Sequence, residues 1–254
     1  MIIGIVSAKG GVGKTTVVVN LASALMELGK RICIIDGNKT TSNLGLHLGI
    51  EDYPISMHDV LKGRSKIIDA VYVHPNHNLH VVPGTLSLAD ARTMNIKSLK
   101  KKMRELEKFY DFVLLDTAPG FNEKALDAMK SCDAVIMITT PGLPEVTDSI
   151  KTIDMLEERK IKVAGIILNR VLGKGFEIKP EEIESLYKVP VILIIEEDLD
   201  VPRSISARIP IVMFKPNSST SQKFMELAAS ISGHKEKGKD FKKLKKVFKG
   251  KLLK

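Results

Sequence analysis

Short aliphatic runs alternate with helix-like stretches along most of the chain. The runs are rich in Val, Ile and Leu and lack polar alternation, which is typical of strands buried on both faces of a parallel sheet. We expect strands at 2–7, 31–36, 79–83, 111–116, 134–139, 163–169 and 189–195. Helices are expected at 14–28, 96–108, 122–129, 144–159, 180–187 and 219–232, and Gly29 is placed to end the first of them. The pattern predicts an α/β fold with a doubly wound, mostly parallel sheet and helices on both of its faces.

The apolar pattern stops near residue 233, and this divides the chain into three parts. We interpret 1–232 as one domain, 233–239 as a linker, and 240–254 as a basic amphipathic helix. The chain has a net charge of +9, but residues 235–254 hold ten lysines against two acidic residues. The rest carries 29 basic and 28 acidic side chains. The domain is therefore nearly neutral, which argues against a basic domain surface for duplex DNA.

Composition also argues against several other classes of protein. Cys33 and Cys132 stand alone in apolar runs, so a disulfide framework or a cysteine metal site is not expected. The six histidines show no metal-ligand spacing. No apolar run is long enough to span a bilayer, and no signal peptide pattern opens the sequence. We therefore expect a protein of a reducing cytoplasm.

The strongest chemical signal is the loop between the first expected strand and the first expected helix. It reads Ala8, Lys9, Gly10, Gly11, Val12, Gly13, Lys14, Thr15, Thr16. Glycines let backbone N–H groups approach phosphate oxygens, and the helix N-terminus adds its positive dipole end. We expect Lys14 to reach the β- and γ-phosphates and the Thr15 hydroxyl to ligate Mg²⁺. The loop predicts a P-loop that binds a nucleotide through residues 10–16.

A second lysine in this loop, Lys9, has no packing reason to be there. Residues 9–16 resemble the deviant Walker A box of the MinD/ParA family of ATPases, at that family's own spacing. The resemblance covers residues 1–232. It implies that Lys9 crosses a dimer interface to contact the phosphates of the other subunit. ATP and Mg²⁺ are then held between two copies of the chain, and the homodimer depends on ATP.

Two strand-end carboxylates fit the metal side of such a site. Asp36 ends the second expected strand and resembles the first switch of the family, near Mg²⁺. Asn38 stands where the family usually has an aspartate that orients the attacking water. An amide can hydrogen-bond a water but cannot take its proton, so we expect slow ATP hydrolysis, unless Asn38 is only a turn residue. Asp116 ends an apolar strand in a Walker B pattern and is expected beside Mg²⁺.

The adenine is expected to lie near the end of the sixth expected strand. Asn169 and Arg170 follow that strand, and an Asn at this place in the family reads the adenine edge. The segment 197–201 resembles the other side of the family's base pocket more loosely.

The C-terminal segment has two faces when it is drawn as a helix. Its apolar face holds Phe241, Leu244, Val247, Phe248 and Leu252, and its lysines occupy the other face. Such a helix suits the surface of an anionic bilayer, where each lysine contributes about 1 kcal/mol. A solvated tail and a nucleic-acid contact remain alternatives, although neither requires aromatic residues at helical spacing.

Three functional hypotheses follow. The first is a MinD-like ATPase that dimerises with ATP, docks on the cytoplasmic membrane through its tails, and regulates cell division or another polar assembly with a protein activator. The second is a ParA-like ATPase that partitions chromosomes or plasmids and binds DNA non-specifically. The third is a metal-cluster carrier of the same fold, which the unpaired cysteines disfavour.

Overall fold

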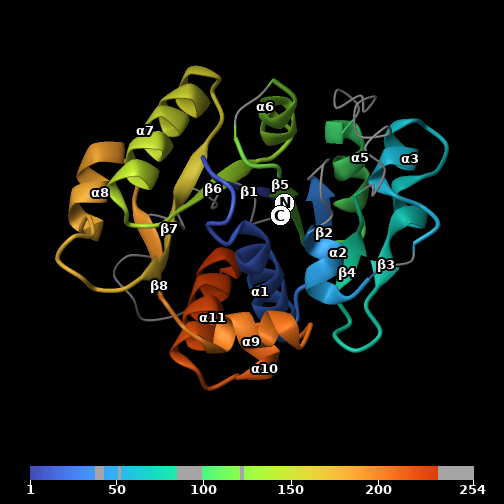
Figure 1. Ribbon diagram of the computed structural model, residues 1–254. Helices are drawn as coiled ribbons and strands as arrows, with labels where there is room; N and C mark the ends of the chain where they lie inside the picture. The colour runs from blue at the N-terminus through green and yellow to red at the C-terminus, as the bar shows by residue number, and fades with distance from the viewer. Residues whose placement is uncertain (38–42, 51–52, 85–98, 121–122, 234–254) are drawn as a thin grey trace.

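An eight-stranded sheet forms the centre of the protein in the computed structural model, which describes residues 1–37, 43–50, 53–84, 99–120 and 123–233 (Figure 1). Helices lie on both faces of the sheet, so the expected fold class is confirmed. Asn38, most of the expected linker and the expected C-terminal helix lie outside the described residues.

The strand order places the end of β1 in the middle of the sheet. The strands are β1 (Ile2–Val6), β2 (Ile32–Gly37), β3 (Tyr72–Val73), β4 (His80–Val82), β5 (Phe112–Thr117), β6 (Ala134–Thr139), β7 (Val163–Val171) and β8 (Val191–Glu196). Their order is β3-β4-β2-β5-β1-β6-β7-β8, and every pair is parallel except β3 with β4. Because β1 lies between β5 and β6, the loop that follows it opens at the crevice where open α/β sheets bind ligands.

The seven expected strands are all present, and β3 is an addition that the sequence pattern does not reveal. The helices are α1 (Lys14–Glu27), α2 (Asn43–Leu48), α3 (Met57–Leu61), a 3₁₀ turn η1 (Ile67–Ala70), α5 (Leu99–Leu106), α6 (Glu123–Lys130), α7 (Leu143–Glu158), α8 (Pro180–Tyr187), α9 (Asp200–Ser206), α10 (Ile211–Phe214) and α11 (Ser219–Ser232). The six expected helices are among them. Gly29 follows α1 with φ +74°, a conformation that favours glycine and ends the helix.

Alternate residues of the central strands pack against opposite layers of helices. Ile3 and Ile5 of β1 are fully buried in the cluster that includes α1 and α11. Ile2 belongs to the cluster under α3 and α5, and Val6 belongs to the cluster under α6, α7 and α8. Both faces of β1 are therefore apolar, which explains why its sequence shows no polar alternation.

Candidate functional site

The phosphate loop joins β1 to α1 and closes over the N-terminus of that helix. Gly13 is the residue before α1 and has φ +97°. A Cβ atom at this position would lie 2.3 Å from Asn169 Nδ2, so a larger residue does not fit without displacing that side chain. Because the loop follows the carboxyl end of β1, the N-terminus of α1 lies at that edge of the sheet, where the helix dipole favours a phosphate group.

Lys14 lies inside the loop. It is 9% exposed, and its Nζ donates a hydrogen bond to Ser7 Oγ at 2.9 Å. Burial lowers the pKa of Lys14, while the nearby Asp116 opposes that shift. The ammonium is therefore a desolvated charge, and an incoming polyphosphate stabilises it more than water would.

Two aspartates from neighbouring strands lie beside the start of α1. Asp36 of β2 pairs with Asp116 of β5 in the parallel register, and each is 2% exposed. Thr15 Oγ1 donates a hydrogen bond to Asp116 Oδ2 at 2.7 Å. Burial raises the pKa of Asp116 to about 6, although the Thr15 hydrogen bond and Lys14 pull it down.

These residues fit a magnesium ion. Asp116 Oδ1 is buried and has no hydrogen-bond partner within the described residues. Mg²⁺ is usually held by one or two carboxylates together with waters and substrate phosphates. The carboxylate of Asp116 and the hydroxyl of Thr15 match this pattern, and Asp36 lies next to them. No group of three or more His, Cys, Asp or Glu side chains among the described residues is arranged to hold a metal.

Lys9 does not share the interior of the loop with Lys14. Its Nζ lies 3.2 Å from Glu145 Oε1 and 3.1 Å from Asp148 Oδ2, both on α7. The Lys9 side chain is 41% exposed, and its hydrogen bonds to these two carboxylates raise its pKa. The two lysines of the loop therefore occupy different environments, one buried and one on the surface.

The expected adenine residues line a cavity of about 240 Å³ beside the loop. Its walls come from the start of α1, the end of β7 and the segment from β8 into α9. Asn169 is 9% exposed, and its Nδ2 donates a hydrogen bond to the carbonyl of Val12 at 2.7 Å. Arg170 is exposed, with φ +57°. Asn169 is thus tied to the phosphate loop and borders a cavity that also reaches Glu197.

Sequence reasoning missed several contacts of the site. Ser7, Glu145 and Asp148 hold the two lysines, and Thr16 Oγ1 lies 3.3 Å from His47 Nε2 of α2. No local spacing links Lys9 with Glu145, because 136 residues separate them. Asn38 and the five apolar residues of the expected C-terminal helix lie outside the described residues.

No helix within the described residues is both long and apolar enough to cross a bilayer.

Known proteins with this combination of fold and loop are similar along nearly the whole chain. The AAA domain family matches residues 1–163. An uncharacterised ATP-binding protein of Methanocaldococcus jannaschii is 33% identical over 252 residues, which is 99% of this chain and 95% of that protein. The septum site-determining protein MinD of Thermotoga maritima is 30% identical, covering 91% of this chain and 88% of that protein.

Solved structures give the same result. The septum site-determining protein MinD of Pyrococcus horikoshii, solved as a complex with Mg-ADP, is 36% identical and superposes with a TM-score of 0.84. The match covers 91% of this chain and 95% of that one. Together with the phosphate loop and its two lysines, these similarities show that the chain belongs to the MinD/ParA family of P-loop ATPases.

Proposed function

We propose that this ATPase is a dimerisation switch. It binds ATP with Mg²⁺, forms a homodimer, and then associates with the cytoplasmic face of an anionic membrane through its C-terminal helix. Slow hydrolysis, raised by a protein activator, returns the dimer to monomers. The switch acts as a spatial regulator of cell division or of another polar assembly.

The position of Lys9 is the observation that carries this proposal. A cation that served the phosphates of its own subunit would be expected inside the loop, and Lys14 already occupies that place. The Lys9 ammonium instead lies nearer the surface, between the partly exposed carboxylates of Glu145 and Asp148. Exposed ion pairs of this kind are weak, so they do not prevent transfer of the ammonium to a stronger anion. The triphosphate of a second subunit is such an anion.

Each nucleotide-binding residue has a separate role in the proposal. Lys14 neutralises the β- and γ-phosphates, while Thr15 and Asp116 hold Mg²⁺ with Asp36 next to its waters. The cavity bordered by Asn169 takes the adenine. Asn38 orients the attacking water without removing its proton, which makes hydrolysis slow.

Dimerisation couples nucleotide binding to the membrane. A single short amphipathic helix binds an anionic bilayer weakly. A dimer presents two such helices, and linking two weak contacts raises the overall affinity without any new contact. The membrane-bound fraction then follows the amount of ATP-bound dimer.

The names of two relatives support the MinD branch of the family over the ParA branch. The similar proteins of Thermotoga maritima and Pyrococcus horikoshii carry the name of septum site-determining protein MinD. The nearly neutral domain favours the same branch over non-specific binding to chromosomal DNA.

Co-sedimentation with anionic liposomes tests the proposal. We expect the full chain to pellet in ATP but to remain in the supernatant in ADP. A chain that ends at Lys237 and the Lys9→Ala variant should both stay in the supernatant, for different reasons. Cross-linking in solution separates them, because the shortened chain still dimerises and Lys9→Ala does not.

Two other outcomes contradict the proposal. Pelleting that is equal in ATP and ADP would indicate a permanent anchor and no switch. No pelleting, together with ATP-dependent DNA binding that falls steeply with salt, would favour the partitioning hypothesis.

A further inference from the structure

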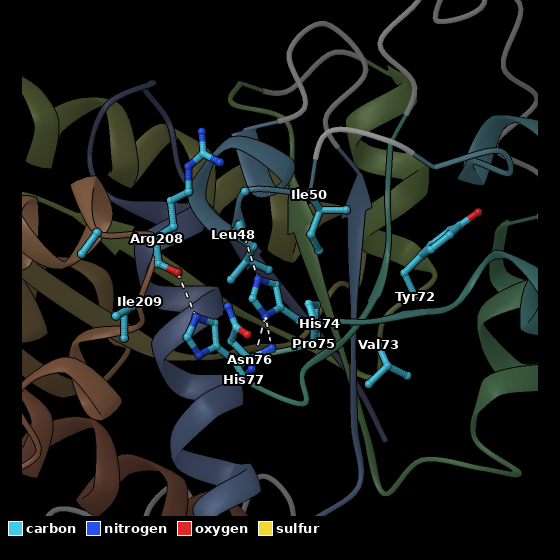
Figure 2. Close-up of a pocket in the computed structure, with 12 residues that line it drawn as sticks. Leu48, Ile50, Tyr72, Val73, His74, Pro75, Asn76, His77, Arg208 and Ile209 are labelled. Carbon is cyan, nitrogen blue, oxygen red and sulfur yellow. Dashed lines mark hydrogen bonds between the residues drawn. The ribbon is translucent and has the colours of Figure 1, made fainter.

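A second and larger cavity, of about 910 Å³, lies away from the phosphate loop (Figure 2). It is lined in part by His74 and His77, whose rings stack with their centroids 4.4 Å apart. His74 Nε2 donates to the carbonyl of Leu48 at 2.7 Å. His77 Nε2 donates to the carbonyl of Arg208 at 3.0 Å. The two rings therefore join three segments of the fold: the end of α2, the turn after β3, and the connection between α9 and α10.

A different surface feature, an apolar patch, lies at the carboxyl edge of the sheet, where β6 and β7 end. Three large side chains are exposed there: Phe176 by 75%, Leu143 by 65% and Leu172 by 52%. Leu143 is the first residue of α7, and the other two belong to the loop that follows β7. The N–H of Ile178 donates to the carbonyl of Pro141 at 2.9 Å, which holds this loop against the turn before α7. We call Leu143, Leu172 and Phe176 the apolar patch.

The loop that carries two of these residues is stabilised by Glu177. One oxygen of its carboxylate accepts from the N–H of Leu172 at 2.9 Å, and the other accepts from the N–H of Lys174 at 3.0 Å. Desolvation acts to raise the pKa of Glu177, but the backbone hydrogen bonds of the loop outweigh it and lower that pKa. The exposure of Phe176 is thus a property of an ordered loop, and an ordered loop loses little conformational freedom when a partner covers it.

The apolar patch adjoins Lys9. Lys9 Nζ lies 3.2 Å from Glu145 Oε1, and Glu145 is two residues after Leu143 in the first turn of α7. In the proposed dimer, the Lys9 ammonium contacts phosphates that the other subunit holds. A lysine side chain is short compared with a subunit, so the second subunit must also cover the surface around Lys9. Leu143 then lies in that interface or at its boundary.

The chemistry of the patch suits a second copy of the same chain. An interface with two-fold symmetry joins the same surface of both subunits, so that surface must be complementary to itself. An apolar surface meets this condition because the burial of apolar groups is not directional, whereas a surface of one charge repels its copy. The cores of homodimer interfaces are also more apolar than ordinary protein surface.

We propose that the apolar patch packs against a second copy of this chain in the ATP-bound dimer. This inference rests on the proposed dimerisation switch and adds the contacts that hold its two subunits together. Lys9 makes the dimer depend on ATP, and the apolar patch contributes affinity that salt does not screen. The loop after β7 is thereby an element of the dimer and not only a connection to α8.

Sedimentation velocity of the full chain tests the proposal, with Mg²⁺ and a non-hydrolysable ATP analogue and without lipid. Phe176→Ser should raise the dissociation constant of the dimer roughly tenfold or more, because each dimer loses two apolar side chains. The loss should be equal at about 0.1 M and about 0.5 M NaCl, since apolar contacts are not screened. Glu177→Gln keeps the apolar side chains but removes one acceptor from the loop, so it should weaken the dimer roughly threefold.

Phe109→Ser is the matched control for Phe176→Ser. Phe109 is also exposed, by 51%, but it lies in the turn before β5, at the amino edge of the sheet. This variant should leave the dissociation constant of the dimer unchanged. The ADP affinity and the thermal melt of each variant show that its nucleotide site and its fold are intact.

A fluorescent probe reports on the patch directly, because the sequence contains no tryptophan. The emission of Phe176→Trp should shift to shorter wavelength with the ATP analogue but not with ADP, since the dimer removes the indole from water. The midpoint of this shift should depend on protein concentration. Phe109→Trp should show no shift. A shift in Phe176→Trp that is independent of protein concentration would overturn the proposal, because it would mean a change within one subunit.

Failure of this inference is distinguishable from failure of the proposed switch. Normal dimerisation of Phe176→Ser, together with loss of the dimer in Lys9→Ala, would keep the switch and exclude the patch from its interface. A normal dimer of Phe176→Ser that binds anionic liposomes less well than the wild type would mean that the loop, with its exposed Lys174, contacts lipid instead. A wild type that forms no dimer with the ATP analogue would overturn both proposals.

Discussion

Replacing Asp116 by asparagine should stabilise the protein without nucleotide and also abolish its Mg²⁺-dependent function. Burial raises the pKa of this carboxyl from the ordinary value of 3.8 to about 6 in the folded chain. Between these two pH values the folded state holds a proton that the unfolded state has lost. Stability therefore falls as the pH rises through this window, and the ionised group costs the folded state about 3 kcal/mol above it. Asparagine has a similar shape, can still accept from Thr15, and is never charged.

Urea unfolding of the wild type and of Asp116→Asn, at about pH 5 and about pH 8, measures this effect. Other groups titrate in both proteins and cancel in the difference. For the pKa values above, the advantage of the variant should grow by about 1.4 kcal/mol between the two pH values. The variant should also lose the tightening of nucleotide binding that Mg²⁺ gives the wild type.

A stability difference that is the same at both pH values would contradict this prediction. In that case Asp116 is not held in a desolvated environment, and the unpartnered Oδ1 is not being kept for a cation. Asp111→Asn is a useful control, because its pKa is lowered by Arg31, and its effect should not grow between the two pH values.

Three further predictions concern the phosphate loop and the first switch. Gly13→Ala places an alanine in a backbone conformation with positive φ and brings its Cβ against Asn169, so the ADP affinity measured by calorimetry should fall roughly tenfold or more. Gly175→Ala is the control, because this glycine lies in open space and the ADP affinity should not change. Lys9→Ala should leave the midpoint of urea unfolding unchanged, because the ion pairs of Lys9 are partly exposed, but it should abolish the ATP-dependent dimer seen in light scattering. A variant that still dimerises normally would show that Lys9 is not part of the dimer interface. Asn38→Asp should raise steady-state phosphate release, because a carboxylate can accept the proton of the attacking water; an unchanged rate would mean that residue 38 does not contact that water.

Much of the fold could be predicted because parallel strands leave a simple trace in the sequence. Ile2 and Ile3 face opposite helix layers and both are buried, so β1 reads as an unbroken apolar run. The strand β3 has only two residues, one of them half exposed, which is too short for any pattern. The helices α2, α9 and α10 are also too short to show a helical period.

The site shows a similar division between local and distant features. The residues that we propose for phosphate and Mg²⁺ follow strand ends, so the loop and Asp116 stand out in the sequence. The partners of Lys9 come from a helix that folds over the loop, and only the packing of α7 against the sheet brings them close. The cavity with His74 and His77 also depends on three segments far apart in the chain, so neither histidine shows a recognisable spacing.

The central position of β1 sets an order for folding during synthesis. In the sheet that the described residues form, β1 lies between β5 and β6, and both of these strands leave the ribosome long after it does. Until then the five residues of β1, which are all buried in the finished fold, have no strand beside them. The loop at its end also lacks the hydrogen bond that Asn169 of β7 donates to the carbonyl of Val12. A nascent chain that stops before β6 is therefore a candidate for chaperone binding or aggregation, and it gains no stability from ATP. Nucleotide can assist folding only after more than half of the protein has been made.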